Sequence, residues 1–279
     1  MKKGISYWSL EGGLSGERDI EDAMRESRSC GFQSIELAVG YKGVLTPETT
    51  QDRCRKIVNT AEEIGIEISS VATGIYWETS LTDNDPKVRE KAIQATKKIL
   101  AIAHWLKTDA ILVIPGAVDI FFRPEYPPHQ YDEVYKRAVQ SIKKLIPTAE
   151  KYKVAMCLEN VWNKFLLSPM EMKDFIDKFK SKYVKSYFDA ANVLLYGYPD
   201  QWIKILGNRI KRIHIKDFKR SVGTADGFCD LLEGDLDFKK LMSALRSIKY
   251  HGYITAEMIP PTSGILDRTS RAIDKILKM

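Results

Sequence analysis

Residues 154–189 read VAMCLENVWNKFLLSPMEMKDFIDKFKSKYVKSYFD, and this stretch contains the repeating unit of the fold. The short apolar run at its start predicts a strand over Val154–Glu159, and the run at its end predicts another over Lys185–Asp189. Between them Pro169 opens a segment of helical period that we expect to extend to Lys180. A strand, a helix and a strand in succession are typical of a parallel α/β sheet.

The same alternation continues outward from this stretch to both ends of the chain. Strands are predicted near Gly4–Trp8, Ser34–Val39, Glu67–Ala72, Ala110–Ile114, Val154–Glu159, Lys185–Asp189, Arg212–Lys216 and Tyr253–Glu257. Helices are predicted near Asp19–Cys30, Pro47–Ile64, Pro86–Leu106, Tyr131–Tyr152, Pro169–Lys180, Pro199–Leu206, Phe238–Ile248 and Gly264–Leu277.

Eight such units in 279 residues predict a (β/α)8 TIM barrel that forms a single domain over residues 1–279, because this fold typically needs about 250 residues. A doubly wound sheet is the alternative. That fold would favour a glycine-rich turn after a strand, and neither G-x-G-x-x-G nor G-x-x-x-x-G-K occurs in the sequence.

The composition indicates a compact protein. Hydrophobic residues make up 44% of the chain and charged residues 29%, which excludes a disordered, collagen-like or disulfide-scaffold protein. No apolar run approaches the roughly 18 residues that a membrane span needs, and the start of the chain, MKKGI, leads to Trp8 rather than to a signal-peptide core. We therefore expect a soluble cytoplasmic protein with no membrane partner.

The cysteines and the net charge further limit the class of protein to which the chain can belong. The four cysteines, Cys30, Cys54, Cys157 and Cys229, lie far apart without a C-x-x-C pair, so we expect them to be reduced. The net charge of +6 comes from 43 basic and 37 acidic residues spread along the helices. This balance is compatible with an anionic substrate and predicts no nucleic-acid partner.

Four predicted strands end on side chains that can bind a metal. Active-site residues of TIM barrels lie at the carboxyl ends of the strands, where alternate side chains point toward the barrel axis. This period of two turns Glu159, Asp189, His214 and Glu257 inward, one from each of the last four strands. We expect the four side chains to meet at one rim of the barrel.

This set of side chains predicts a divalent metal ion. Three carboxylates at one place would repel one another unless a cation neutralised them, and one imidazole with carboxylate oxygens suits a divalent ion. Mn²⁺, Mg²⁺ or Co²⁺ fits this set best, with Mn²⁺ as the first choice. Zn²⁺ is a further candidate, although a site without thiolates does not demand it.

The last four units also contain motifs of a known family. With them the chain resembles the xylose-isomerase-like sugar isomerase/epimerase superfamily, and within it the ketose 3-epimerases of the tagatose and ribulose-phosphate type. The matching motifs are Leu158-Glu159-Asn160, Phe188-Asp189-Ala190-Ala191-Asn192, His214-Ile215-Lys216-Asp217, Glu233-Gly234-Asp235-Leu236-Asp237-Phe238 and Ala256-Glu257. The first half of the chain agrees with the family in pattern more than in residues.

The resemblance implies an isomerase. It implies that Glu159, Asp189, His214 and Glu257 hold a single metal ion and that Glu159 and Glu257 are also the catalytic acid and base. The expected reaction is epimerisation of a ketose at C3, with a proton removed from one face and returned to the other through a metal-stabilised enediolate. The same residues would serve aldose–ketose isomerisation, so this reaction remains an alternative.

Residues around the predicted metal are expected to bind the substrate. They are Asn192, Lys216, Arg220 and Trp8. Free-ketose epimerases carry a histidine where this chain has Asn192, which favours a sugar phosphate, whereas Arg220 matches an arginine of the free-ketose enzymes. We therefore expect either a sugar or a sugar phosphate as the small-molecule partner.

Three further residues are expected to support the site. Glu36, within a predicted strand, is expected to stand behind the metal ligands. Phe121 and Phe122, in the long loop Pro115–Gln130, are expected to close over the site or to build a dimer contact. Barrels of this family often pair through such loops, so we expect a homodimer or a homotetramer.

Three other functions remain as rivals. A hydro-lyase of the inosose dehydratase kind would use a similar metal site but eliminate water. A non-catalytic sugar-binding module would bind a sugar without turnover. A DNA-repair enzyme like endonuclease IV shares the barrel but needs three zinc ions. Its extra histidines correspond here to the neighbourhoods of Thr73 and Pro115, which cannot bind a metal, so this function fits the sequence least well.

Overall fold

The computed structural model describes residues 1–279 and contains a closed barrel of parallel strands, as predicted. Around the barrel the strands follow the order β1, β10, β7, β6, β5, β4, β3 and β2, with β2 returning to β1. Their bounds are β1 Lys2–Ser6, β2 Ser34–Val39, β3 Glu67–Thr73, β4 Ala110–Val113, β5 Ala155–Glu159, β6 Val184–Asp189, β7 Ile210–Ile215 and β10 Tyr253–Ala256. The chain is therefore a (β/α)8 TIM barrel.

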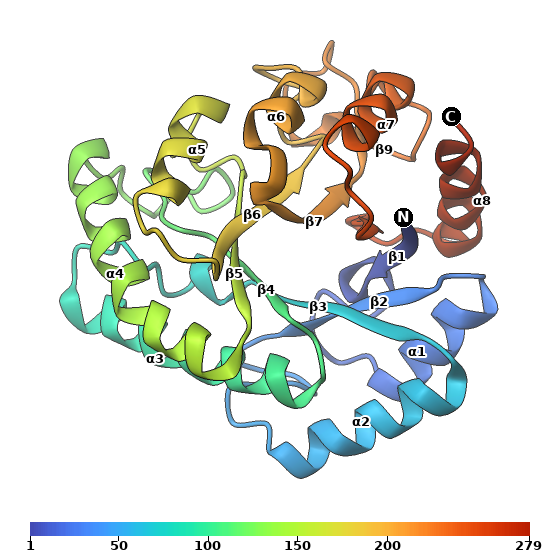
Figure 1. The fold of residues 1–279 in the computed structure, drawn as a ribbon, viewed down its shortest axis with the longest axis horizontal. Coiled ribbons are helices and arrows are strands. Elements are labelled where there is room, and N and C mark those ends of the chain that lie inside the picture. Colours follow the sequence, from blue (N-terminus) through green and yellow to red (C-terminus); the bar gives the residue numbers. More distant parts are fainter.

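One α-helix follows each barrel strand, and Figure 1 shows the helices as an outer layer around the strands. Their bounds are α1 Ile20–Ser29, α2 Gln51–Ile64, α3 Pro86–Trp105, α4 Tyr131–Tyr152, α5 Pro169–Asp177, α6 Pro199–Leu206, α7 Phe238–Ser247 and α8 Ile265–Leu277. Side-chain caps fix several starts. Ser168 Oγ, for example, accepts a hydrogen bond from Glu171 N at 3.1 Å immediately before Pro169 opens α5.

Several predicted boundaries differ from those of the structure, and two of the differences have a clear physical cause. The helix expected from Pro47 begins at Gln51, because Thr50 caps it by accepting a hydrogen bond from Arg53 N at 3.3 Å. The first strand ends at Ser6 rather than at Trp8, because Tyr7–Ser9 form a 3-10 turn. Trp8 therefore lies in a turn at the mouth of the barrel.

A second, two-stranded sheet was not predicted. After β7 the chain forms β8, Asp217–Phe218, which pairs antiparallel with β9, Phe228–Cys229. Strands of two residues are too short to show a hydrophobic period, so the sequence holds no signal for them. This small sheet places Phe228 over the carboxyl ends of the barrel strands, where its ring centroid lies 5.0 Å from Lys216 Nζ.

The opposite end of the barrel is closed by an arginine. Arg212, on β7, is 5% exposed, and its guanidinium donates hydrogen bonds to Asp109 Oδ1 at 2.5 Å and to the carbonyl oxygen of Ser69 at 2.8 Å. Asp109 also accepts a hydrogen bond from Lys211 Nζ. A buried guanidinium is stable only when it is paired, so these contacts tie β7 to the neighbourhoods of β3 and β4.

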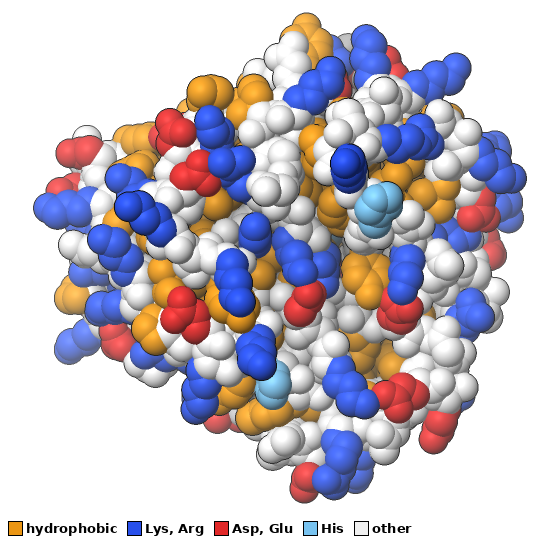
Figure 2. Space-filling view, viewed as in Figure 1, with side chains coloured by type: hydrophobic (Ala, Val, Ile, Leu, Met, Phe, Trp, Pro, Cys, Tyr) orange, Lys and Arg blue, Asp and Glu red, His pale blue; other side chains and the backbone are white.

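The surface carries charges of both signs. Figure 2 shows the lysines and arginines of one face dispersed among acidic and uncharged side chains rather than gathered in a single stripe. None of the helices combines the length and the apolar character needed to cross a membrane.

Candidate metal centre

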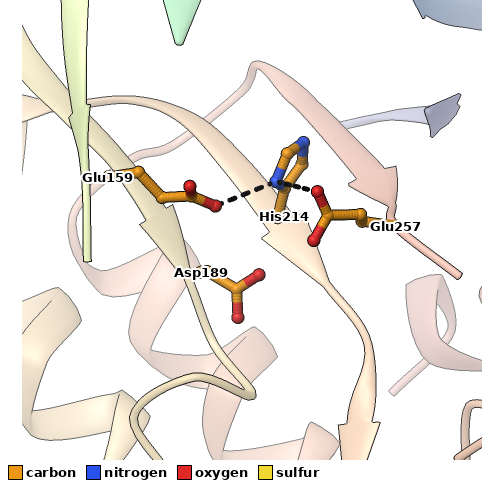
Figure 3. A group of neighbouring side chains, drawn as sticks. All are labelled: Glu159, Asp189, His214 and Glu257. Carbon is orange, nitrogen blue, oxygen red and sulfur yellow. Dashed lines mark hydrogen bonds and ion pairs between the residues drawn. The ribbon is translucent and has the colours of Figure 1, made fainter. Parts of the chain in front are cut away.

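The four predicted ligands meet at the carboxyl ends of the strands. Glu159 ends β5, Asp189 ends β6, His214 lies near the end of β7, and Glu257 follows β10. Each offers one ligand atom, and these atoms lie within 4.8 Å of one another. None of the four residues is more than 6% exposed. Figure 3 shows the two glutamates reaching the imidazole from two sides, with Asp189 beside them.

His214 is oriented by a fully buried carboxylate. Its Nε2 lies 2.8 Å from Glu36 Oε1, while Glu36 Oε2 accepts hydrogen bonds from the Tyr187 hydroxyl at 2.5 Å and from Ser70 Oγ at 2.8 Å. Because a carboxylate only accepts, Nε2 is the nitrogen that carries the proton toward Glu36. The other nitrogen, Nδ1, faces the centre of the cluster, 3.4 Å from Glu159 Oε1. This orientation is the one that a metal-binding histidine needs.

Asp189 is held in place and yet keeps one oxygen unsatisfied. Its Oδ1 accepts a hydrogen bond from Asn192 N at 2.8 Å, and Asn160 binds its backbone N–H and C=O at 3.0 and 2.8 Å. Its Oδ2 is buried without a hydrogen-bond partner. Lys216 Nζ lies 3.0 Å from this oxygen, but their orientation does not form a hydrogen bond. A buried carboxylate oxygen in this state fits a metal ligand.

The cluster is short of positive charge. Burial, together with the charge of Glu257, raises the pKa of Glu159 to about 7, and burial also raises the pKa of Asp189. Burial opposes ionisation of Glu257 too, but Lys216, 2.5 Å away, and His214 outweigh it and hold the pKa of Glu257 below its usual value. Three carboxylates stand against one ammonium, that of Lys216, so a divalent ion bound beside a neutral His214 would balance their charge.

The protonation of His214 leads to the same conclusion. Burial disfavours the charged imidazole, but Glu36 and Glu257 outweigh burial and raise the pKa of His214 well above its usual value. In the absence of a cation the ring therefore keeps a proton on Nδ1, between the two glutamates. A metal ion would take the place of this proton. The four residues thus fit a divalent ion in donor type, burial and charge.

A cavity of about 950 Å³ opens above the cluster. Glu159 and Glu257 line its floor, and three of the predicted substrate-binding residues, Trp8, Asn192 and Lys216, also line it. The fourth, Arg220, does not join them. Its guanidinium lies over the ring of Tyr198, 5.7 Å from the ring centroid, in a separate groove outside the cavity.

Several aromatic residues of the cavity were not predicted. The loop pair Phe121 and Phe122 was expected near the site, but Tyr41, Trp77 and Trp162 line the cavity as well. Each of these three lies two to four residues beyond the end of a barrel strand. An aromatic residue at that place is the sequence signal that could have identified them.

Asp217 holds the loop that contains the Glu-Gly-Asp motif. Its carboxylate accepts hydrogen bonds from the backbone N–H groups of Leu232, Gly234 and Leu236 at 3.0 Å each, and from that of Phe218 at 2.8 Å. Position 234 requires glycine, because a Cβ atom there would lie 2.3 Å from Asp217 Oδ1. The motif thus has a structural role beside the metal cluster.

Comparison with known families identifies the barrel. The family described as "Xylose isomerase-like TIM barrel" matches residues 24–276. Among curated proteins, an uncharacterized protein of Methanocaldococcus jannaschii is 22% identical over 195 residues, which cover 68% of this chain and 64% of that protein. The match therefore spans a little under two thirds of the length of that relative.

Solved structures share the whole fold. The D-psicose 3-epimerase of Clostridium cellulolyticum H10, solved with D-tagatose, has a TM-score of 0.78 at 19% identity, with 99% of each chain covered. The 3-keto-D-glucoside 4-epimerase of E. coli has a TM-score of 0.78 at 16% identity, with 100% of each chain covered. An L-ribulose 3-epimerase has a TM-score of 0.77 at 18% identity, with 99% of this chain and 94% of that chain covered. At these identities the likeness shows a shared fold.

Proposed function

The chain belongs to the xylose isomerase-like TIM barrel family, and on that premise we propose that it is a divalent-metal-dependent sugar isomerase/epimerase whose reaction is the 3-epimerisation of a ketose. One observation carries the proposal. Four buried ligand atoms, from three carboxylates and one imidazole, lie within 4.8 Å of one another at the floor of a large cavity. The 3-epimerases among the structural neighbours support the choice of reaction.

In this proposal Glu159, Asp189, His214 and Glu257 hold the ion, with Mn²⁺ as the expected metal. When bound, a divalent ion would polarise the carbonyl and the adjacent hydroxyl oxygen of a sugar. The C–H of the carbon that bears this hydroxyl would then become more acidic. Asp189 and His214 serve as ligands only. Both are fully buried, and their other polar contacts fix their orientation.

Glu159 and Glu257 are the proposed acid and base. They approach His214 Nδ1 from two sides, at 3.4 and 3.7 Å, and both line the cavity floor. A sugar lying between them would present one face of its C3 to each carboxylate. One glutamate then removes the proton from C3, and the other returns a proton on the opposite face.

Trp8, Asn192 and Lys216 are the proposed substrate contacts, since all three line the cavity. Lys216 Nζ is the one with the clearest assignment. It lies 2.5 Å from Glu257 Oε2 and 3.0 Å from Asp189 Oδ2, so it can donate to a substrate oxygen beside the acid–base pair. Asn192 fixes Asp189, and Trp8 offers an apolar wall to the sugar carbons.

Proton exchange with solvent tests the proposal directly. The Mn²⁺ of the loaded protein is first replaced by Mg²⁺. The protein is then incubated in D₂O with D-fructose, D-tagatose, D-psicose, ribulose 5-phosphate and xylulose 5-phosphate as substrates, and the sugars are analysed by ¹H NMR. We expect deuterium at C3 together with the C3 epimer. Glu257→Gln should abolish both, whereas Glu233→Gln, a matched change at an exposed glutamate outside the cavity, should change neither.

Other results of this experiment would assign other functions. Deuterium at C1 or C2 would indicate aldose–ketose isomerisation, and loss of water from the sugar would indicate a hydro-lyase. A sugar that binds without any exchange would indicate a binding module. Light scattering on the same sample tests the proposed homodimer or homotetramer.

A further inference from the structure

The cavity above the metal cluster is larger than a simple sugar requires. Its volume of about 950 Å³ is near the upper end of the range of about 300–1,000 Å³ that holds drug-sized ligands. A free pentose or hexose is considerably smaller than such a ligand. Bound against Glu159 and Glu257 on the floor, it would leave the upper part of the cavity without contacts.

The upper part is lined by a continuous row of aromatic rings, which we call the aromatic arc. It consists of Trp77, Phe122, Phe121, Trp162 and Phe228. Ring centroids of successive members are 5.2, 5.1, 5.9 and 5.0 Å apart. The residues come from the segments after β3, β4 and β5 and from β9, so the arc joins four separate parts of the chain.

One end of the arc lies beside the metal cluster, and the middle of the arc is exposed to solvent. At its inner end the Phe228 ring centroid is 5.0 Å from Lys216 Nζ, and Trp162 Nε1 donates a hydrogen bond to the backbone carbonyl of Asn192 at 2.8 Å. In the middle of the row Phe121 and Phe122 are 52% and 50% exposed. Covering half-exposed phenyl rings inside a cavity with an apolar group removes apolar surface from water and is therefore favourable.

The charges of the cavity do not favour a phosphate. Six charged side chains line it, of which four are acids and two are lysines, and no arginine is among them. One lysine, Lys216, is already paired with Glu257 and lies beside Asp189. The other, Lys42, is exposed. A phosphate dianion would therefore meet no buried, unpaired cation in the upper cavity.

We propose that the substrate is a neutral sugar bearing an apolar substituent of about the size of one aromatic ring on a hydroxyl remote from its carbonyl. The sugar lies at the metal cluster, and the substituent packs against the aromatic arc. This inference rests on the isomerase/epimerase function proposed above, because that function places the sugar ring on the cavity floor.

Calorimetry on the metal-loaded protein tests the inference with three probes: D-fructose, 6-O-benzyl-D-fructose and D-fructose 6-phosphate. The benzyl ether should bind at least about tenfold more tightly than D-fructose, because its ring covers apolar surface of the arc. In a Phe121→Ala/Phe122→Ala double variant this preference should fall to about threefold or less. Both residues are half-exposed, so the fold should tolerate the change.

Tyr198→Ala is the matched control, because Tyr198 is 56% exposed and lies outside the cavity. It should keep the full preference for the benzyl ether. Four results would overturn the inference: equal affinity for the benzyl ether and D-fructose, tightest binding of the phosphate, an undiminished preference in the double variant, or no binding of any probe at millimolar concentration.

Oligomeric state provides one more decisive result. If the wild-type protein is a dimer and the double variant a monomer, the arc is an interface between two copies and the inference fails. Deuterium exchange on the same sugars separates this inference from the proposed function. A benzyl preference without exchange would reject the function alone, and exchange without a benzyl preference would reject the inference alone.

Discussion

Glu36 is a fully buried acid near the barrel axis, and its contacts explain why it is there. One of its oxygens lies 2.8 Å from His214 Nε2, and the other accepts hydrogen bonds from Tyr187 and Ser70. Burying a carboxylate is costly unless it is hydrogen-bonded. The three partners meet that cost, and the contact fixes the imidazole so that Nδ1 faces the other ligands.

We expect Glu36→Gln to weaken Mn²⁺ binding by about 10- to 100-fold, which is the usual effect of losing the partner that orients a ligand histidine. Competition with a chelator of known affinity measures this effect without any substrate. In addition, ¹⁵N NMR of the imidazole should show a changed population of the two nitrogen protonation states.

Ser70→Ala is the control for Glu36, because it removes one hydrogen bond to Glu36 Oε2 and leaves the contact of Oε1 with His214. Its Mn²⁺ affinity should change by no more than about threefold. Equal Mn²⁺ affinity of Glu36→Gln and the wild type would show that Glu36 does not position His214.

At the level of elements, the segment after β8 depends on one side chain. Asp217 accepts four backbone hydrogen bonds, three of them from residues 232–236, and the absence of a side chain at Gly234 makes this close approach possible. The neighbouring Asp235 Oδ2 accepts only the backbone N–H of Arg220, at 2.7 Å. Asp217 therefore holds more of the loop than Asp235 does.

Asp217→Asn should loosen this loop, because an amide replaces one acceptor oxygen with a donor that cannot bind a backbone N–H. We expect hydrogen exchange to become at least about tenfold faster for the amides that lose their acceptor, which are Leu232 and Gly234 on one oxygen or Leu236 on the other, as follows from losing roughly 1.5 kcal/mol of hydrogen bonding. Asp235→Asn should leave these three amides unchanged. Unchanged exchange in Asp217→Asn would mean that other contacts hold the loop.

The strand ends show why much of the site could be predicted from the sequence. A strand has a period of two, so Glu159, Asp189 and His214 could be assigned to the inner face from their neighbours alone. The structure brings these side chains together as expected.

Residues of irregular segments were harder to predict. Trp77 and Trp162 follow strands without any periodic pattern, and their meeting through Phe121 and Phe122 depends on loop conformations that no local rule gives. The position of Arg220 outside the cavity could not be predicted for the same reason. The turn after β8 directs it over Tyr198, which spacing from His214 could not reveal.

At the level of the whole molecule, a bound metal should stabilise the fold. An ion that binds only the native state at 100 times its dissociation constant adds about 2.7 kcal/mol to the free energy of unfolding. For a protein of this size that corresponds to a rise of roughly 5–10 °C in Tm. Calorimetric scans with Mn²⁺ and with excess EDTA should differ by this amount.

Asp189→Asn is the comparison for the metal experiment, because it removes the charge of a carboxylate whose Oδ2 lacks a hydrogen-bond partner. Its Tm should rise by no more than about 2 °C with Mn²⁺. An equal rise in the variant and the wild type would place the ion at some other site.

The base of the barrel should lose stability in acid. Burial opposes ionisation of Asp109, but Arg212 and Lys211 outweigh it and hold the pKa of Asp109 below its usual value. A carboxyl group whose pKa is lowered by folding contributes stability above its unfolded pKa, and this contribution is lost as the pH falls through the folded pKa. Acid should therefore weaken the barrel below about pH 4.

Urea unfolding between pH 7 and pH 2.5 tests this expectation with Asp109→Asn. The variant should be less stable than the wild type at pH 7, and the difference should shrink toward pH 2.5. Because Asp109 is 55% exposed, the part due to its charge should be less than about 1 kcal/mol. Asp52→Asn, at an exposed ion pair with Arg55, should show no such pH-dependent difference.

The position of β1 between β2 and β10 has a consequence for synthesis of the chain. Lys2 pairs with Tyr253, so β1, which is made before the other strands of the barrel, finds one of its two neighbours only after some 250 further residues have been made. At a synthesis rate of about 5–20 residues per second, one edge of β1 stays unpaired for at least about ten seconds. During that time an unpaired strand edge is open to association with other chains. Pulse-labelled nascent chains stalled before residue 253 should therefore be bound by holding chaperones, and chains released after α8 should not.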